Sequence, residues 1–335
     1  MKWTRLFVLM TLTLIAMHAS AGTYYVGACH TGSFPTISAA VSSSTVAAGS
    51  TIKVCPGTYP EQVIISKSLT LQGLSANGLG AANIQGSASD LTVTNLDSEL
   101  LRPSIWVTGG TVNLSNINIT QAYSPSDCSS YIAGIYYASG SSGIINHVNV
   151  SIVPSGQPAN CTTSVGAWLE NGNTLKATVT VENSTFEVGN QGIFAMSKQA
   201  AQAPPVLSAT ISGNQIFIYG VNSTGISMQN DAGTVAKNMI AGGSVGVVMG
   251  STGLAVTGNT INTAQGIQVG PQATVTGNRI RSATGIVFDC KTGTVTGNTI
   301  TGDGSSSSTG YVLPPKGFSG VNSFHNVAKT SSGTC

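Results

Sequence analysis

The chain has 335 residues, of which 41 are glycine and only 7% are charged. This composition excludes a charged disordered chain and an ordinary helical protein, because both are rich in charged residues. Lys2 and Arg5 lie in a leader that we expect to be removed, and without them basic and acidic residues are equal in number. Such a neutral chain has no basic patch for nucleic acid or an anionic membrane, and we expect neither as a partner.

The N-terminal residues 1–21 have the pattern of a signal peptide. Two basic residues precede an apolar run over residues 6–17, which is followed by Ala19-Ser20-Ala21. This order is typical of a cleaved secretory signal, and the run is short for a membrane span. We therefore expect cleavage after Ala21, no membrane span in the mature chain, and export to the periplasm or the extracellular medium.

Six cysteines follow the leader. An even number of cysteines in an exported chain favours disulfide bonds, although six cysteines allow 15 pairings. Sequential pairing is the simplest hypothesis because each bond then closes a local segment. It would give Cys29–Cys55, Cys128–Cys161 and Cys290–Cys335. The spacing of Cys and His indicates no zinc site, and we predict no cofactor.

A short phrase with an asparagine recurs along the second half of the chain, for example in Val256–Ile261 and Val275–Ile280. The steps between the asparagines are 31, 24, 21, 19 and 20 residues. A period near 20 residues without a helical pattern predicts that each copy is one coil of a solenoid. The asparagines of the successive copies are Asn183, Asn214, Asn238, Asn259, Asn278 and Asn298.

A second phrase keeps step with the first. It consists of a glycine followed by an apolar residue, any residue and another apolar residue, as in Gly246–Met249 and Gly285–Phe288. We expect two short strands in each coil, with apolar residues inward and polar residues outward. Stacking the coils predicts an all-β fold, a single-stranded right-handed parallel β-helix of about a dozen coils. Stacked amides would then form a ladder at Asn238, Asn259, Asn278 and Asn298.

The mature chain, residues 22–335, is expected to form a single domain. An N-terminal cap over residues 22–50 would contain one short amphipathic helix within residues 35–47, which closes the open end of the core. A C-terminal cap over residues 311–335 would begin where Pro314 and Pro315 stop the repeat. Nothing in the sequence indicates a linker, and we expect a monomer.

The segment Thr51–Gly73 resembles the first coils of pectinesterases and related right-handed β-helix proteins of the pectin-lyase-like superfamily. Gly57, Tyr59 and Glu61 match the G-x-Y-x-E motif of pectinesterases, and Ile37–Val41 matches the helix before it. The resemblance implies the fold and a polysaccharide as partner. The catalytic motifs of pectinesterases and polygalacturonases are absent. We therefore expect the three matching residues to support the structure of the first coil.

The carboxylates of the chain do not align into a ladder from coil to coil. A dense ionic patch lies in an irregular excursion that carries Asp90, Asp97, Glu99 and Arg102. A calcium site or a catalytic cluster in this excursion is the alternative to a solvated loop, which we favour. Near the C-terminal end, Arg281 and Asp303 could pair across adjacent coils, with little effect on stability.

Three large aromatic residues occupy the outward position of the second phrase in coils that we expect to be consecutive. They are Tyr136, Trp168 and Phe194. Stacked at the spacing of parallel strands, about 4.8 Å, they would form a flat apolar strip on which sugar rings can stack. The alternative is that the loops of residues 154–161 and 200–205 cover the strip.

Three functions remain open from the sequence. The first is an exported β-helix that binds, or processes, polysaccharide along its surface. The second is a structural or adhesive surface rod, and the third is a lyase or esterase with dispersed catalytic residues. Exposure of Tyr136, Trp168 and Phe194 favours the first function and burial of these residues favours the second. The scarcity of charge argues against the third.

Overall fold

The computed structural model describes residues 20–75, 82–87, 89–121, 130–152, 163–198, 207–229, 231–316 and 318–335. Nearly all of the expected signal peptide, together with Cys128 and Cys161, lies outside these residues. Among the residues described, no helix is both long enough and apolar enough to cross a membrane.

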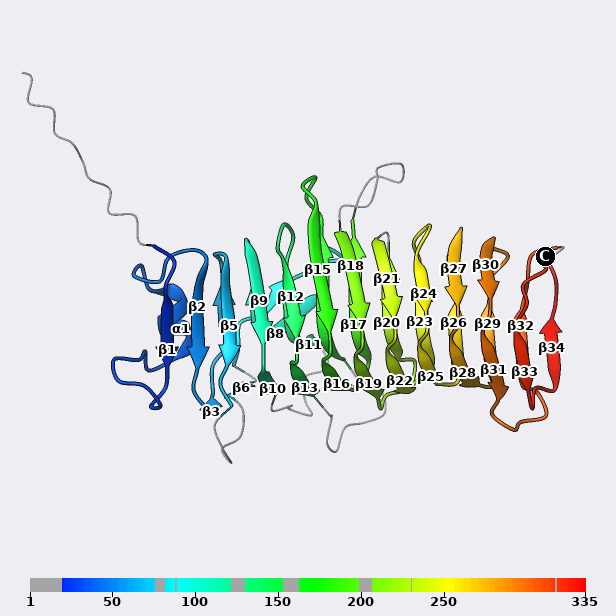
Figure 1. Cartoon of the computed structure of the whole chain (residues 1–335), viewed down its shortest axis with the longest axis horizontal. Helices are drawn as coiled ribbons and strands as arrows, with labels where there is room; N and C mark the ends of the chain where they lie inside the picture. The colour runs from blue at the N-terminus through cyan, green and yellow to red at the C-terminus, as the bar shows by residue number, and fades with distance from the viewer. Residues whose placement is uncertain are drawn as a thin grey trace, which may run out of the picture.

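The strands wind into a parallel β-helix with three long sheets, which we call sheets A, B and C (Figure 1). Sheet A contains β1 (Thr23–Val26), β2 (Ser50–Val54), β5 (Leu69–Gly73), β9 (Thr111–Ser115), β12 (Ser142–Asn146), β15 (Ala177–Glu182), β18 (Leu207–Ser212), β21 (Ala232–Ala236), β24 (Ala255–Thr257), β27 (Ala273–Thr276) and β30 (Gly293–Thr296). Sheet B contains β3 (Gly57–Tyr59), β6 (Ala82–Gly86), β10 (Ile117–Gln121), β13 (Asn149–Ile152), β16 (Thr185–Val188), β19 (Gln215–Ile218), β22 (Met239–Gly242), β25 (Thr260–Asn262), β28 (Arg279–Ser282), β31 (Thr299–Gly302) and β33 (Ser323–His325).

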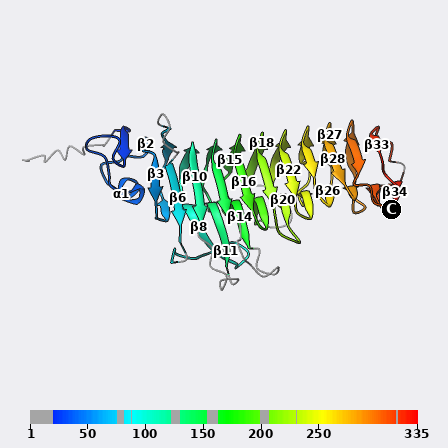
Figure 2. The same cartoon turned by 90° about the horizontal axis from the view of Figure 1, so that it is seen from below.

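Sheet C forms the third face of the rod. It contains β4 (Val63–Ile65), β8 (Leu100–Val107), β11 (Tyr131–Tyr137), β14 (Ser164–Asn171), β17 (Gln191–Ser197), β20 (Thr224–Gln229), β23 (Val245–Met249), β26 (Gln265–Gln268), β29 (Thr284–Val287), β32 (Thr309–Val312) and β34 (Lys329–Ser332), and β7 (Val93–Thr94) pairs with β8 in the antiparallel sense. Strands β8, β11, β14 and β17 have seven or eight residues, whereas β26, β29 and β32 have four. The long strands β8, β11 and β14 project to one side of the rod (Figure 2).

Each regular coil contains three strands, and the prediction of two strands was wrong. The asparagine phrase spans two of them, because Val256 lies in β24 and Ile261 lies in β25. The turn between them is made at Gly258, whose φ of 64° lies in the left-handed region that glycine adopts without strain. The phrase is therefore a strand, a sharp corner and a second strand.

The core is a set of inward columns in which like residues stack from coil to coil. In sheet B, Ile240, Ile261 and Ile280 are paired in register and are all buried. Burying an aliphatic side chain of this size contributes about 1.5–3 kcal/mol relative to leaving it in water. The same column, repeated in every coil, therefore fixes the register of the whole rod.

The glycine of the second phrase is required by the isoleucine column of sheet B. A Cβ atom placed on Gly246 would lie 2.4 Å from Cγ2 of Ile261 and 2.7 Å from the carbonyl oxygen of Gly266. The same close approach recurs at Gly225 and Gly266. The phrase therefore marks the point where sheet C passes closest to the core side chains of sheet B.

A buried asparagine ladder forms the corner between sheets A and B. Asn259 Nδ2 donates to Asn278 Oδ1 at 2.9 Å, and Asn278 Nδ2 donates to Asn298 Oδ1 at 2.9 Å. Each amide also bonds backbone groups of neighbouring coils, so that its polar atoms are satisfied inside the protein. The ladder runs through Asn214, Asn238, Asn259, Asn278, Asn298 and Asn322.

Asn183 is not part of this ladder, although the phrase places it there. Its backbone occupies the left-handed position, with a φ of 49°, which Gly213 takes in the next coil. Ser184 stands at the ladder position instead, and its N–H donates to Asn214 Oδ1 at 3.0 Å. The asparagine in the phrase of that coil therefore serves the turn and not the stack.

The N-terminal end is closed by a shorter helix than the sequence suggests. Helix α1 (Ile37–Ser42) buries Ile37, Ala40 and Val41 against the core. Thr36 caps it by accepting from the N–H of Ala39 at 3.1 Å. It ends early because the hydroxyl groups of Ser43 and Thr45 bond each other at 2.8 Å, which favours a turn over a further helical turn. The Cys29–Cys55 disulfide is present, as predicted.

The C-terminal end continues the repeat beyond Pro314 and Pro315, which was not expected. Strand β32 ends before them, but the chain then adds β33 and β34, and Asn298 Nδ2 donates to Asn322 Oδ1 at 2.8 Å. The predicted Cys290–Cys335 disulfide is also present and ties the last residue to the coil before.

Replacing a central member of the asparagine ladder should weaken the fold. In Asn278→Ala, buried donors and acceptors on both neighbouring coils lose their partner, so we expect the free energy of unfolding to fall by about 2–4 kcal/mol. Urea unfolding followed by circular dichroism measures this change. The control is Asn262→Ala, at an exposed position of β25, which should change the free energy by no more than about 0.5 kcal/mol. Equal losses in the two variants would contradict a role for the ladder.

Candidate functional site

The three residues that match the pectinesterase motif make contacts within the first coil. Glu61 accepts from the N–H groups of Ile37 and Ser38, both at 2.8 Å, and so caps helix α1. Tyr59 is buried and donates to the carbonyl oxygen of Cys55 at 2.8 Å. Gly57 has a φ of 151°, a backbone conformation that favours glycine. These contacts hold the N-terminal helix against the coil.

The aromatic residues of the predicted strip do form one column on the outer face of sheet C. Tyr136 pairs in register with Trp168, and Trp168 pairs with Phe194. The ring centroids of Trp168 and Phe194 lie 4.4 Å apart. The column begins one coil earlier with Trp106, which the sequence analysis missed. Trp106 was missed because Ser104 stands in place of the glycine that marks the second phrase in later coils. The apolar residues on either side of Trp106, Ile105 and Val107, do follow the phrase and could have revealed it.

The column is covered, which is the alternative to exposure that the sequence left open. The exposed fractions of Tyr136, Trp168 and Phe194 are 3%, 2% and 5%. Part of the cover is the excursion before β8, residues 89–99, which we call the strap. Val93 and Leu96 of the strap pack against the aromatic cluster. The two loops that we expected to cover the column, residues 154–161 and 200–205, lie outside the described residues.

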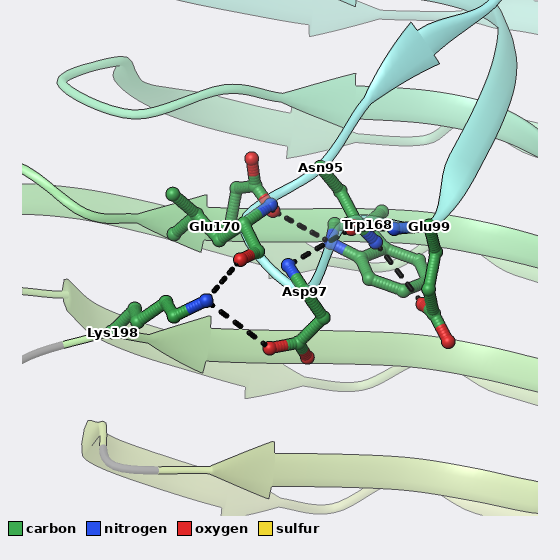
Figure 3. Close-up of polar contacts among 7 residues, drawn as sticks. Asn95, Asp97, Glu99, Trp168, Glu170 and Lys198 are labelled. Atoms are coloured by element: carbon green, nitrogen blue, oxygen red, sulfur yellow. Dashed lines mark hydrogen bonds and ion pairs between the residues drawn. The ribbon is translucent and has the colours of Figure 1, made fainter.

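A buried carboxylate fastens the strap to the column (Figure 3). Glu170, at the end of β14, is 3% exposed. Tyr136 donates its hydroxyl to one carboxylate oxygen, and the other accepts from Trp168 Nε1 and from the N–H of Leu96, both at 3.2 Å. Burial raises the pKa of Glu170, and the charge of Asp97 adds to this, while the three hydrogen bonds act in the opposite direction.

The exposed side of the strap has a second fastening. Lys198, which follows β17, donates to the carbonyl oxygen of Leu96 and lies 4.0 Å from a carboxylate oxygen of Asp97 (Figure 3). Within the strap, Asn95 donates to Glu99 at 3.1 Å and accepts from the N–H groups of Asp97 and Glu99. The excursion is therefore fastened at Leu96, whereas Asp97 and several of its neighbours are exposed, as in the solvated loop that was expected.

In this closed arrangement both oxygens of Glu170 are occupied by donors, so neither faces a substrate. In the chain as described, no three residues among His, Cys, Asp and Glu come together as metal ligands. Arg281 and Asp303 lie near each other. Hydrogen bonds from Ser305 lower the pKa of the exposed Asp303, and the charge of Arg281 adds to this.

The outer face of sheet A carries a column of hydroxyl groups that the sequence analysis did not single out. One outward position in each of the eleven strands of the sheet lines up in register. Eight of these positions carry threonine, and the other three carry Asn113, Ile144 and Ala255. The threonines of this column, which we call the threonine column, are Thr23, Thr51, Thr70, Thr180, Thr210, Thr234, Thr274 and Thr294. All of them are at least partly exposed. The strand register, which sequence alone does not fix in the early coils, was needed to find it.

A second buried carboxylate lies at the corner between sheets C and A. Asp231 is fully buried, and Ser197 donates to one of its oxygens at 2.9 Å. The other oxygen has no hydrogen-bond partner in the structure described. Burial raises the pKa of Asp231 to about 8, and the bond from Ser197 opposes the shift. Nothing in the repeat pattern marks this residue as internal.

The comparison with known protein families finds one match. The family described as right handed beta helix region matches residues 165–333, which is half of the chain. No curated protein sequence matches the chain.

Solved structures share the architecture at low sequence identity. The lacto-N-biosidase of family GH136 from Eubacterium ramulus is similar, with a TM-score of 0.57 and 8% identity over 93% of this chain and 67% of its own. XylC in complex with xylose is similar, with a TM-score of 0.50 and 11% identity over 90% of this chain and 69% of its own. At such identities these similarities establish the fold.

The buried Asp231 should make stability depend on pH. Its pKa is higher in the folded chain than in the unfolded chain, so the folded state holds the proton longer and loses stability as the pH rises from about 4 to about 8. The loss approaches about 1.4 kcal/mol per pH unit at most. Asp231→Asn should remove this contribution, and urea unfolding of both proteins at pH 4, 6 and 8 measures the difference.

The control for this experiment is Asp303→Asn, which changes an exposed carboxyl with a lowered pKa. The lowered pKa of Asp303 makes the folded chain lose stability as the pH decreases, and this change occurs below about pH 4. Between pH 4 and pH 8 the control should therefore behave as the wild type does. If the stabilities of wild type and Asp231→Asn stayed parallel from pH 4 to pH 8, the raised pKa of Asp231 would be refuted.

Proposed function

Because the chain belongs to the right handed beta helix region family, we propose that it uses its length as a binding surface and holds neutral polysaccharide along the outer face of sheet A. The observation that carries the proposal is the threonine column. Hydroxyl groups recur there at the strand spacing, about 4.8 Å, in eight of the eleven strands of sheet A, with interruptions at Asn113, Ile144 and Ala255. An elongated partner with its own repeat of hydroxyl groups can bond to many of them at once.

The charge of this face supports a neutral partner. In the column beside the threonines, Lys53 and Glu182 are the two charged residues, and the other positions carry polar or small side chains and Tyr25. Acidic polysaccharides bind where basic side chains gather, because charged groups attract oppositely charged ligands. A surface of hydroxyl and amide groups suits uncharged sugar hydroxyls, which both donate and accept hydrogen bonds.

The structural neighbours agree with a carbohydrate partner. One is named as a biosidase and the other holds xylose. Their similarity to this chain establishes the fold alone, so the proposal rests on sheet A. The disulfides Cys29–Cys55 and Cys290–Cys335 support a site of action outside the cytoplasm, where such bonds persist.

The proposal is tested by removing hydroxyl groups while keeping the shape of the strands. The variant Thr210→Val/Thr234→Val/Thr274→Val retains β-branched side chains and should fold as the wild type does. We expect it to bind at least about tenfold more weakly in co-sedimentation with cellulose, chitin and insoluble xylan, because three hydrogen bonds are lost.

The matched control makes the same change on another face. Thr260→Val/Thr299→Val/Thr301→Val alters three threonines of the outer face of sheet B and should bind as the wild type does. The proposal fails if wild type sediments with none of the three polysaccharides, or if the two triple variants lose binding equally.

The burial of the aromatic column favours a second candidate function. A rod whose apolar surface is covered, as Trp168 is here, can serve through its shape as a structural or adhesive element of the cell surface. In that case the folded chain binds no polysaccharide in the sedimentation experiment, and both triple variants match the wild type.

A further inference from the structure

We propose that the strap is a cover that opens, and that the aromatic column beneath it is a second binding site, which takes the ring faces of a neutral oligosaccharide. This site lies on sheet C and is separate from the face of sheet A on which the proposed function rests.

The covered column has the form of a sugar-stacking surface. Trp106 and Tyr136 lie nearly parallel, with an angle of 15° between their planes and 6.5 Å between their centroids. Trp168 continues the column one strand further. The planes of Trp168 and Phe194 are inclined to each other by 54°, so the rings form a contiguous aromatic surface and not a flat row. Aromatic faces on such a surface accept the C–H groups of a pyranose ring through apolar contact. The rod needs no such surface for folding, since β23, β26 and β29 place Val248, Gln268 and Val287 at this position.

The polar atoms of the column are suited to a polar ligand. The indole N–H of Trp106 is shielded from solvent and has no hydrogen-bond partner in the structure as described. Glu170 lies beside Trp168 and accepts from its indole N–H (Figure 3). When the strap moves away, Glu170 loses the N–H of Leu96 and gains a free position for a sugar hydroxyl. Sugars bind where an apolar ring face and such acceptors meet.

The strap is held mainly by side-chain contacts, at Leu91, at Leu96 and at Glu99. Gln62 bonds the N–H and the carbonyl oxygen of Leu91, and Tyr131 bonds Glu99. Leu96 bonds Glu170 through its N–H and Lys198 through its carbonyl oxygen, and its side chain lies over Gly172. The antiparallel pairing of β7 with β8 extends over two residue pairs. Burying the Glu170 carboxylate works against closure, as its raised pKa shows, because three hydrogen bonds do not fully replace its hydration. Because the strap lacks the continuous backbone pairing of the coils, it is expected to open more easily than they do.

The experiment loosens the outer fastening and reads the exposure of Trp168, which is buried, and of Trp106, which is partly buried. Of the three tryptophans of the chain, Trp3 lies in the leader that we expect to be removed, so a protein of residues 22–335 has Trp106 and Trp168 as its tryptophan fluorophores and serves as the parent background. In this background Lys198→Ala removes the contacts to Leu96 and Asp97 from a position that is already exposed. We expect acrylamide to quench the fluorescence about two- to fivefold more strongly than in the parent.

The same proteins are titrated with cellotetraose and chitotetraose. Opening raises the fraction of chains competent to bind, so Lys198→Ala should bind the tetrasaccharides about two- to fivefold more tightly than the parent. Trp168→Leu in the Lys198→Ala protein keeps an apolar side chain but removes the ring, and should lose this binding.

Matched controls separate the strap from general loosening and from sheet A. Lys291→Ala removes a lysine that lies at the same 4.0 Å from an aspartate, Asp289, on another part of the rod, and should change neither quenching nor binding. The triple valine variant of the threonine column should keep tetrasaccharide binding, so the two proposals fail independently. The inference is overturned if Lys198→Ala leaves quenching unchanged, if Lys291→Ala has the same effect, or if the exposed tryptophans bind neither tetrasaccharide at millimolar concentration.

Discussion

The structure depends on the register between successive coils. Parallel pairing sets one strand spacing for all three sheets, and the inward isoleucine column of sheet B together with the buried asparagine ladder prevents any coil from slipping by a residue. Because successive residues of a strand point to opposite faces, the register that aligns the inward side chains from coil to coil also aligns the outward side chains. The threonine column and the aromatic column exist because the core has already aligned the strands that carry them.

The repeat explains why the fold was predictable from sequence. Asn259 and Asn278 satisfy their amides on each other, which requires the same residue at the same place in every coil, so the packing leaves a visible period. The glycines of the second phrase also recur with the period of the coils. Only glycine leaves room for the isoleucine of sheet B, as Gly246 does for Ile261. In the early coils the constraint is met by other residues. Ser184 replaces an asparagine and Ser104 replaces a glycine. The predicted ladder from Asn238 to Asn298 was confirmed, whereas Trp106 in an early coil was missed.

The candidate sites were less predictable because they depend on contacts without a period. The outward column of Tyr136, Trp168 and Phe194 followed from the repeat, but its burial depends on the strap, an insertion that occurs once. Its closure rests on Glu170 and Leu96, which are 74 residues apart in the chain. Asp231 likewise meets Ser197 across a corner. A single long-range contact leaves no pattern in one sequence, whereas a contact repeated in every coil does.

The disulfide at the C-terminal end has a consequence for self-association. A stack of parallel strands ends in an edge with unpaired backbone groups, and such an edge can receive the first coil of another rod. Here Cys335 is bonded to Cys290, which holds the tail that carries β34 against the final coil. Because Lys329 and the serines of β34 form the outermost strand, the rod presents a charged, polar terminus in place of an open apolar one. Cleavage of this bond by a reductant would release the tail and allow β34 to leave β32, which exposes the backbone edge of β32 in sheet C.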